Sequence, residues 1–269
     1  MPNLDLSLCR TLLFLPASNS RAIEKARELV ADFIILDLED AVPEDRKEEA
    51  RASAIAAAAQ GFGGRPFALR INPAGSPHHG RDMLPARDSR FPFVVLPKVE
   101  TRRHIHDTKV VCERSIIAMV ESARAVLAAS EIAADAAALL VGTNDLSADL
   151  QIPLGSGRSG LATALQQVVL AARAAGRPVF DGVYNRLEDD EGLAAEAREG
   201  RCFGFDGKSV IHPSQIDAVN GIFSPTAEEV AAAEALIAAH TAGAQRFEGR
   251  MVEAMHVEQA RRLIARARR

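Results

Sequence analysis

The chain has 269 residues, of which 48% are hydrophobic, and its formal net charge is −4. This length suffices for one large α/β barrel or for two ordinary domains. No basic stretch is interleaved with aromatic side chains, so we expect no nucleic acid partner. No stretch is both long enough and apolar enough to cross a bilayer, so we expect no membrane association either.

The cysteines and the N-terminus indicate the compartment. Cys9, Cys112 and Cys202 are far apart, which gives neither a metal-ligand pair nor the disulfide framework of a small secreted protein. The first residues lack the basic and apolar regions of a signal peptide. We therefore expect a cytoplasmic protein.

Short apolar runs alternate with alanine- and charge-rich runs of helical spacing along most of the chain. Such alternation predicts a parallel sheet with right-handed crossovers. About eight strand candidates at this spacing favour a TIM (β/α)8 barrel over an open doubly wound sheet. No glycine-rich phosphate loop follows the first candidate, which also weighs against the open nucleotide-binding folds. The expected strands are residues 11–16, 33–40, 66–72, 93–98, 115–121, 138–142, 178–183 and 205–211, and the clearest helices are 21–30, 43–60, 123–133 and 160–176.

Residues 1–223 are expected to form the barrel, and residues 224–269 a C-terminal helical extension. Residues 224–229 read as a helix start, with Ser or Thr at the cap and acids in the first turn. Residues 247–251 interrupt the helical pattern, and a last helix ends in a basic run at 266–269. This run is typical of a solvated helix C-terminus.

Polar side chains gather at the ends of six predicted strands. In a barrel the carboxyl ends of the strands meet on one face, where catalysis takes place. One acid at such a position is usually a salt-bridge partner or a helix cap, but their concentration on one face points to a functional site. The residues are Asp37, Glu39 and Asp40; Arg70; Lys98 and Glu100; Glu121; Asn144 and Asp145; and Asp206 and Lys208 with His212, for which the following proline favours a structural turn.

Glu121 and Asp145 end what we expect to be consecutive strands, so their carboxylates should lie side by side. Two neighbouring carboxylates repel unless one is protonated or a cation lies between them. Oxygen ligands with open coordination positions suit Mg²⁺. The alternative is a structural pair balanced by Arg70 or Lys98.

Arg70 is the strongest candidate for a fixed positive charge in the site. A guanidinium is always charged and binds a carboxylate or an enolate oxygen at two points. The residues alone leave a second interpretation open, in which Arg70 is a buried ion-pair partner of Asp37 or Glu39.

Seven motifs occur in chain order, at residues 10–17, 36–43, 70–73, 96–100, 121–122, 142–150 and 204–215. Together they resemble the citrate lyase β-subunit-like proteins of the HpcH/HpaI aldolase superfamily, and the similarity covers nearly the whole chain. This resemblance implies a TIM barrel that binds Mg²⁺ and forms homo-oligomers, often trimers.

The resemblance also implies roles for individual residues. Glu121 and Asp145 correspond to the metal ligands, and Arg70 to a substrate contact with a catalytic role. The backbone of Gly142, Thr143 and Asn144 would contact the oxo acid, together with Glu121. Arg21 and Lys25, after the first strand, would contact the phosphates of CoA.

One position departs from the family pattern. The CoA lyases carry a catalytic aspartate in a C-terminal Gly-x-Met-[Ile/Val]-Asp motif, which reaches the site of a neighbouring subunit. Here the corresponding residue is Glu253, whose carboxylate extends about one methylene further. A shift of about 1 Å in a catalytic group can lower a rate about 100-fold. Three interpretations stay open: the site is adjusted around Glu253, the lyase activity is weak, or Glu253 is a plain surface residue.

The activity implied by the resemblance is Mg²⁺-dependent carbon–carbon cleavage of a β-hydroxyacyl-CoA thioester of the citramalyl, malyl or citryl type. The products would be acetyl-CoA and a 2-oxo acid. Two alternatives remain: an aldolase of free 4-hydroxy-2-oxo acids, and a binding subunit for CoA or an oxo acid with little catalysis.

Overall fold

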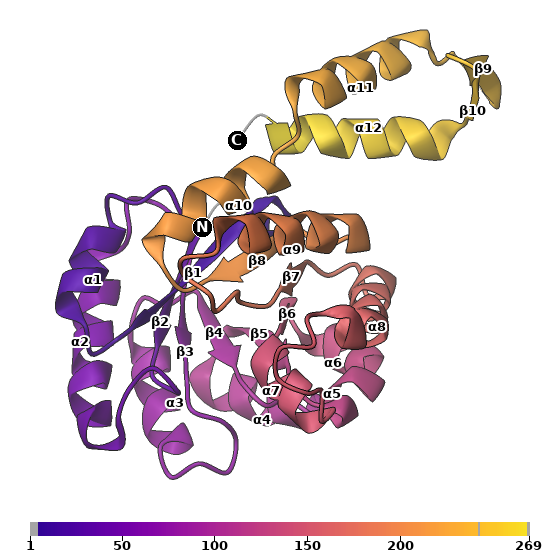
Figure 1. Ribbon diagram of the computed structural model, residues 1–269. Helices are drawn as coiled ribbons and strands as arrows, with labels where there is room; N and C mark the ends of the chain where they lie inside the picture. The colour runs from indigo at the N-terminus through magenta and orange to yellow at the C-terminus, as the bar shows by residue number, and fades with distance from the viewer. Residues whose placement is uncertain (1–4, 242, 268–269) are drawn as a thin grey trace. The chain divides into compact units, whose positions relative to one another are not determined.

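Eight parallel strands close into a barrel in the chain order β1 to β8, and helices surround it (Figure 1). The computed structural model describes residues 5–241 and 243–267. Strand β1 pairs with both β2 and β8, so the sheet is closed and the predicted TIM barrel is confirmed. The barrel strands are β1 (Thr11–Pro16), β2 (Phe33–Asp37), β3 (Phe67–Arg70), β4 (Phe93–Leu96), β5 (Ser115–Val120), β6 (Ala138–Val141), β7 (Val179–Asp181) and β8 (Gly207–Val210).

All eight predicted strands exist, but most are shorter than the sequence suggested. β2 shows the reason, because the carboxylate of Asp37 accepts the N–H groups of Glu39 at 2.8 Å and Ala41 at 3.2 Å. An aspartate that binds its own following backbone turns the chain out of the sheet. The polar residues after β2 therefore lie in the loop that follows the strand and not in the strand itself.

The barrel interior is filled by side chains. All five residues of β2 are buried, as expected for a strand covered on both faces. Phe33, Ile35 and Leu140 belong to a cluster at the barrel centre and are completely buried. The barrel is thus a packed core and not a pore.

Several helices begin at a side-chain cap. Asn19, Ser122 and Asp189 accept backbone N–H groups at the starts of α1, α5 and α9. The predicted helix 123–133 is divided in two, and Gly176 follows α8 with φ 64°. The helices of the barrel are α1 (Ser20–Ala26), α2 (Lys47–Gln60), α3 (His79–Asp88), α4 (Arg102–Cys112), α5 (Ala123–Leu127), α6 (Ala129–Asp135), α7 (Thr143–Asp149), α8 (Ala162–Ala174), α9 (Asp190–Phe203) and α10 (Ile216–Phe223), with 3₁₀ turns η1 (Leu6–Leu8), η2 (Glu44–Arg46), η3 (Ser159–Leu161) and η4 (Pro213–Gln215).

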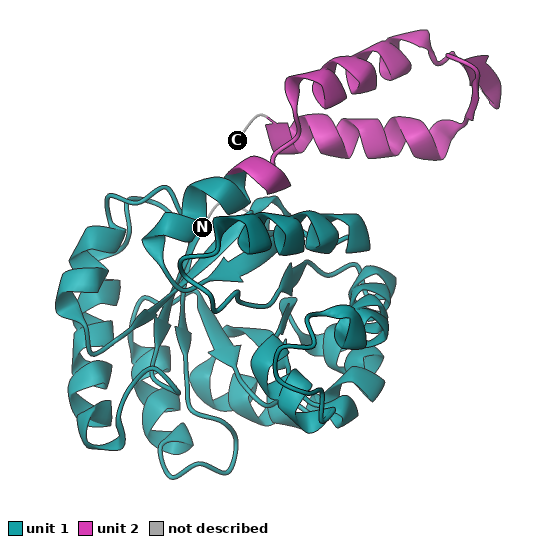
Figure 2. Ribbon diagram, in the orientation of Figure 1, with its two compact units in different colours: residues 1–220 teal, residues 221–269 magenta. Residues whose placement is uncertain are grey.

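The chain divides into two compact units, Met1–Asn220 and Gly221–Arg269 (Figure 2). This division falls inside α10, three residues before the predicted boundary at 223. In the second unit α11 (Ala227–Ala239) begins at a capping box of Thr226 and Glu229. The second long helix of this unit is α12 (Ala254–Ala267), and residues 268–269 of the predicted basic run lie outside the described residues.

The second unit also contains a β-hairpin that the sequence did not predict. Strands β9 (Gln245–Phe247) and β10 (Arg250–Val252) are antiparallel. Glu248 and Gly249 connect them with φ values of 47° and 79°. Two central residues with positive φ are typical of the type I′ turn that matches strand twist. The interruption expected at 247–251 is therefore a tight hairpin.

Among the described residues none of the three cysteines forms a disulfide bond; Cys9 and Cys112 are buried and Cys202 is exposed. Across residues 5–241 and 243–267, no helix has the length and hydrophobicity needed to cross a bilayer.

Candidate active site

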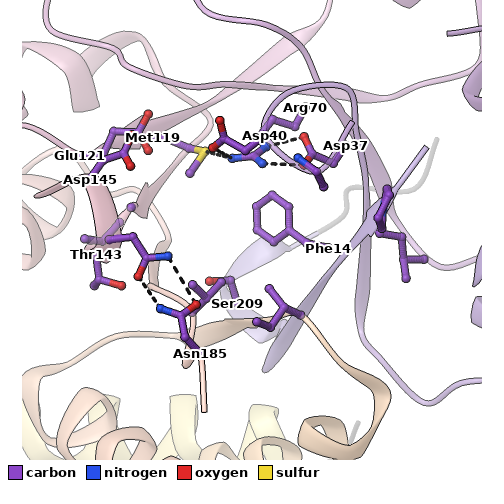
Figure 3. Close-up of a pocket in the computed structure, with 18 residues that line it drawn as sticks. Phe14, Asp37, Asp40, Arg70, Met119, Glu121, Thr143, Asp145, Asn185 and Ser209 are labelled. Atoms are coloured by element: carbon purple, nitrogen blue, oxygen red, sulfur yellow. Dashed lines mark hydrogen bonds and ion pairs between the residues drawn. The ribbon is translucent and has the colours of Figure 1, made fainter. Parts of the chain in front are cut away.

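A pocket opens at the carboxyl ends of the barrel strands (Figure 3). Its wall combines an apolar part, which includes Phe14 and Met119, with a dense set of charged and amide groups. The polar lining residues are Asp37, Asp40, Arg70, Thr143, Asn144, Asp145, Asn185, Ser209 and Glu121. Strand ends far apart in the sequence thus meet around one cavity.

The ends of β5 and β6 bring Glu121 beside Gly142. Val120 pairs with Val141 in the sheet, and the N–H of Gly142 donates to the carbonyl of Val120 at 3.0 Å. A Cβ added at Gly142 would lie 2.2 Å from Oε2 of Glu121. Only glycine leaves room for this carboxylate, so the chemistry of position 121 depends on the residue at 142.

Lys98 contacts Glu121 through its backbone. Its N–H donates to Oε1 of Glu121 at 2.6 Å, and its φ of 53° lies in the left-handed region. This conformation is uncommon for a residue with a side chain and often occurs at functional sites. The Lys98 ammonium is 3.6 Å from Oδ2 of Asp145 and 3.6 Å from Oε1 of Glu39.

Burial raises the pKa of Glu121 to about 7. The Lys98 amide opposes this shift, whereas the negative charge of Asp145 adds to it. The two carboxylates therefore lie close enough to repel, as predicted from the strand order, and Figure 3 shows them at the same side of the pocket.

The donor set on this side fits Mg²⁺. Both groups are carboxylates, and their mutual repulsion would be relieved by a cation between them. No cluster of three or more His, Cys, Asp or Glu side chains with metal-binding geometry occurs within the described part of the chain. A metal here would have two protein ligands and several open positions, which is how Mg²⁺ commonly binds water and substrate oxygens.

Arg70 ends β3 directly beside Asp37, the last residue of β2. Its Nε and Nη2 donate to the two oxygens of Asp37 at 2.6 Å each, and its Nη1 lies 2.9 Å from Glu39. The guanidinium also stacks on Phe14 at 5.0 Å from the ring centre. Burial alone would lower the pKa of Arg70, but Asp37 and Glu39 outweigh it and raise the pKa. Arg70 is thus a buried ion-pair partner and also lines the pocket.

Glu39 has an unusual environment beside Arg70. Burial raises its pKa to about 7, although the charge of Arg70 opposes the shift. Within the described residues its two carboxylate oxygens accept no hydrogen bond, and its contacts are the ion pairs with Arg70 and Lys98. The negative charge of Glu39 is therefore unfavourable in this buried position, and the nearby cations only partly offset the cost of burial.

Two residues expected at the barrel mouth are elsewhere. Asp206 precedes β8 and accepts the N–H of Val179 at 2.8 Å, and Lys208 is completely buried against Asp181. Asp206 lies before the amino end of β8, beside the first residue of β7, and Lys208 lies on the face of β8 opposite to the pocket-lining Ser209. His212 caps η4 by accepting the N–H of Ser214, as the structural interpretation predicted.

The remaining predicted residues are outside the pocket lining. Arg21 and Lys25 lie one turn apart on α1, and both are exposed. Glu253 precedes α12 in the second unit and is exposed, and its backbone N–H donates to Nδ1 of His256 at 3.0 Å. The roles of these three residues stay predictions.

Asn185 is a pocket residue that the sequence did not reveal. It follows β7 by four positions, and its side-chain amide pairs with that of Asn144 at 2.6 Å and 3.4 Å. The signal that marks the other strand ends, a polar residue just beyond an apolar run, is present here too. The predicted strand ended at Val183, so Asn185 fell just outside the strand end and was not assigned to the site.

Comparisons with known proteins agree with this geometry. Residues 10–213 match the HpcH/HpaI aldolase/citrate lyase family. A (3S)-malyl-CoA thioesterase of Cereibacter sphaeroides is 37% identical over 96% of this chain and 94% of its own length. A citrate lyase subunit beta-like protein of Mycobacterium tuberculosis is 34% identical over 95% of this chain and 94% of its own length.

Among solved structures, the protein CitE of Mycobacterium tuberculosis in complex with magnesium, acetoacetate and coenzyme A superimposes with a TM-score of 0.85. It is 33% identical, and the match covers 98% of this chain and all of that one. Family match, sequence identity and fold agree over nearly the full length, and the chain belongs to the HpcH/HpaI aldolase/citrate lyase family.

Proposed function

We propose that this protein is a Mg²⁺-dependent carbon–carbon lyase that cleaves a β-hydroxyacyl-CoA thioester into acetyl-CoA and a 2-oxo acid. The observation that carries the proposal is the pair of Glu121 and Asp145 at one pocket, across from Arg70. The magnesium and coenzyme A of the related CitE structure support the choice of metal and carrier.

The substrate chemistry follows from the charges of the pocket. Mg²⁺ between Glu121 and Asp145 would supply positive charge beside the substrate oxygens and lower the pKa of the β-hydroxyl. Transfer of the hydroxyl proton to solvent and cleavage of the adjacent carbon–carbon bond leave the 2-oxo acid and the enolate of acetyl-CoA. Arg70 stabilises negative charge on a substrate oxygen, because its position is fixed by Asp37 before the substrate arrives.

Cleavage is complete only when the enolate carbon gains a proton. We assign this step to Glu253 of a neighbouring copy in a homo-oligomer, with a trimer as the favoured form, and we assign the CoA phosphates to Arg21 and Lys25. Glu253→Gln should lower turnover with little change in substrate affinity, since it removes proton transfer and keeps the binding groups. Glu253→Asp should keep activity or raise it. Wild-type turnover of Glu253→Gln would contradict the assignment.

Thioester hydrolysis is the second candidate function, because a relative with 37% identity is named a malyl-CoA thioesterase. The same pocket charges would then act on the thioester carbonyl and a water molecule. The two reactions differ in their products, since hydrolysis releases the free thiol of CoA and leaves the carbon chain intact.

The deciding experiment is an assay of malyl-CoA, citramalyl-CoA and citryl-CoA, each with Mg²⁺ and with EDTA. Free thiol and 2-oxo acid are measured in the same samples. We expect a 2-oxo acid without free thiol, and loss of the reaction in EDTA. Free thiol with no oxo acid would establish the thioesterase instead. Activity on free 4-hydroxy-2-oxo acids alone would favour the aldolase, and no turnover of any substrate would favour a binding subunit.

A further inference from the structure

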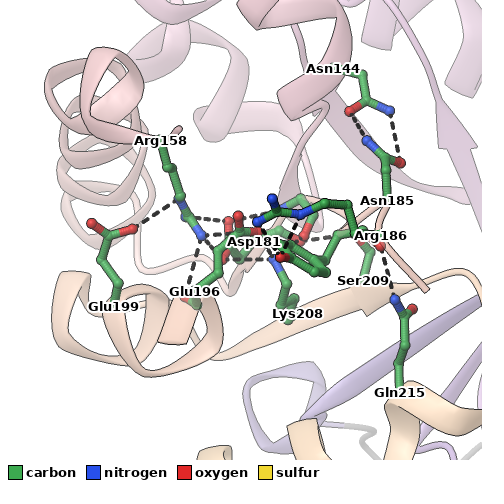
Figure 4. A network of polar contacts seen from close by, with 12 residues as sticks. Asn144, Arg158, Asp181, Asn185, Arg186, Glu196, Glu199, Lys208, Ser209 and Gln215 are labelled. Atoms are coloured by element: carbon green, nitrogen blue, oxygen red, sulfur yellow. Dashed lines mark hydrogen bonds and ion pairs between the residues drawn. The ribbon is translucent and has the colours of Figure 1, made fainter. Parts of the chain in front are cut away.

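A buried polar cluster lies between β7, β8 and α9, behind the wall of the pocket (Figure 4). At its centre Lys208 is completely buried. Its ammonium donates to the carbonyl of Gly182 at 2.5 Å and to Oε1 of Glu196 at 2.6 Å, and it lies 3.3 Å from Oδ2 of Asp181. All three directions of the ammonium are thus occupied by oxygen atoms.

The cluster is a network of ion pairs. Arg158 donates to both oxygens of Asp181, at 2.6 Å and 2.8 Å, and its Nη1 lies 3.4 Å from Glu196. Lys208 and Arg158 therefore face Asp181 and Glu196, and the 40% exposed Glu199 adds a third carboxylate 3.3 Å from Nε of Arg158. Buried ion pairs contribute little net stability compared with apolar packing. A buried polar network can instead fix one conformation of the backbone that it contacts.

The segment that this cluster holds is 182–185, which follows β7. Lys208 binds the carbonyl of Gly182, and Gln215, 1% exposed, donates to the carbonyl of Tyr184 at 2.9 Å. The N–H of Gly182 donates to Oδ1 of Asp181 at 2.8 Å. Side chains from β8 and η4 thus fix this short stretch of backbone from behind.

On its other side the segment contacts the first turn of α7 at two points. A Cβ added at Gly182 would lie 2.4 Å from Oγ1 of Thr143, so the two residues are closely packed. Further along, the amide of Asn185 donates to Oδ1 of Asn144 at 2.6 Å. The same turn of α7 carries Asp145, which lines the pocket.

We propose that Lys208 and Gln215 are positioning residues, which hold segment 182–185 so that it braces the start of α7 and thereby orients Asp145 toward Glu121. The consequence for metal binding and turnover rests on the proposed function. The bracing itself, which is made by the contacts of Gly182 and Asn185 with α7, does not depend on the proposed function.

The test compares Gln215→Leu, Lys208→Met and Asn185→Ala with wild type in the full chain. Glu199→Gln is the matched control, because Glu199 touches the outer end of the cluster through Arg158 at 3.3 Å and is 40% exposed. The first measurement is amide hydrogen exchange of the metal-free protein over residues 143–149 and 182–185. We expect faster exchange in both segments for Gln215→Leu and no change for Glu199→Gln.

The second measurement is Mg²⁺ affinity by calorimetry, together with kcat and KM. Loss of a supporting partner commonly weakens metal binding about 10–100-fold, and we expect about tenfold for Gln215→Leu. Combined with Asn185→Ala, the effect should be smaller than the sum of the two single effects, because both act through the same contact.

The outcomes separate the two proposals. If amide exchange over residues 143–149 is unchanged in Gln215→Leu, the proposed bracing of α7 by segment 182–185 is wrong. Fully additive effects of Gln215→Leu and Asn185→Ala on Mg²⁺ affinity would overturn it as well. A wild-type protein without Mg²⁺ binding or thioester turnover would overturn the proposed function, while the exchange data would still decide on the brace. Should Lys208→Met fail to fold, the uncharged change at Gln215 carries the test.

Discussion

The two sides of the pocket handle buried charge in opposite ways. At the ends of β2 and β3, Arg70 binds Asp37 through two hydrogen bonds of 2.6 Å, so the chain supplies its own counter-charge. At the ends of β5 and β6, Asp145 lies 3.6 Å from the ammonium of Lys98, whose side chain is 48% exposed, and Glu121 accepts the backbone N–H of Lys98 at 2.6 Å.

This difference shows which part of the site is complete without a ligand. A buried charge must be neutralised or paired, and the arginine side is paired within the protein. Burial raises the pKa of Glu121 to about 7, and the charge of Asp145 adds to the shift, so the carboxylate side favours an added positive charge. Burial also raises the pKa of Glu39 to about 7 on the arginine side, but Glu39 is not among the residues that line the pocket. A cation in the pocket would therefore bind at the ends of β5 and β6.

Glu121→Gln should produce the largest effect of any single substitution at the two sides. The amide keeps the shape but loses the charge that attracts a cation, so Mg²⁺ binding should disappear and activity should fall about 1000-fold or more. Calorimetry and turnover measure both effects, and Glu131→Gln on the surface of α6 is the control. Unchanged Mg²⁺ affinity would end the assignment of the carboxylate side as the metal site.

Gly142→Ala tests the same side through its geometry. The new Cβ would lie 2.2 Å from Oε2 of Glu121, so the carboxylate must move. A displacement of about 1 Å commonly lowers activity about 100-fold. Gly221→Ala is the matched control, since a Cβ at Gly221 meets no atom within 4 Å. Full activity and full metal affinity of Gly142→Ala would show that the close contact is not required.

Arg70→Lys tests the arginine side. Lysine keeps the charge but lacks the fork that binds Asp37, so we expect an unfolding free energy lower by about 1–3 kcal/mol. Activity should fall about 100-fold, because the charge at the pocket is no longer fixed.

Arg10→Lys is a matched control for this change. Arg10 forms the same forked pair with Asp32, at 2.8 Å and 2.9 Å, and it does not line the pocket. This variant should lose stability and keep activity. If both variants lose stability and both keep activity, Arg70 is a structural ion-pair partner only.

The smallest effects concern pH. Because the pKa of Glu121 is about 7, this group becomes protonated below that pH, and Mg²⁺ affinity should fall by up to about tenfold per pH unit. Calorimetric titrations from about pH 6 to about pH 8 would measure this change. Metal affinity that is independent of pH in this range would contradict the raised pKa.

The metal-free protein should show the opposite trend in stability. From the ordinary value of 4.5 up to about 7, the folded state binds more protons at Glu121 than the unfolded state does. The contribution of Glu121 to stability should therefore fall as pH rises through this range, by at most about 3 kcal/mol, and Glu39, whose pKa is also raised to about 7, should act in the same direction. Above pH 7, Glu121→Gln should remove this loss and melt at a higher temperature than wild type without metal.

The barrel fold and the proximity of the two carboxylates could be predicted from the amino-acid sequence alone. Eight apolar runs at regular spacing predicted the strands, and the position of Glu121 and Asp145 after consecutive runs predicted their proximity. Both inferences need only the order of the strands along the chain, because parallel strands joined by right-handed crossovers place their carboxyl ends on one face. The motif resemblance pointed to the same family as the later comparisons.

Other features depended on the strand register and on the face of the strand to which each side chain points. The local sequence determines neither of these. Successive side chains of a strand point to opposite faces, so in β8 Ser209 lines the pocket while Lys208 is buried behind it. Asp206 precedes β8 and accepts the N–H of Val179, so it lies at the amino end of the barrel, opposite to the mouth.

The amino-acid sequence by itself determined the barrel, the position of the acidic groups at strand ends and the family. Only the tertiary structure decided that Asp37 occupies the fork of Arg70, that Asn185 meets Asn144, and that Lys208 holds the backbone behind them. The physical reason is that each of these contacts joins residues more than 25 positions apart, and their geometry is set by barrel closure and strand register rather than by local sequence.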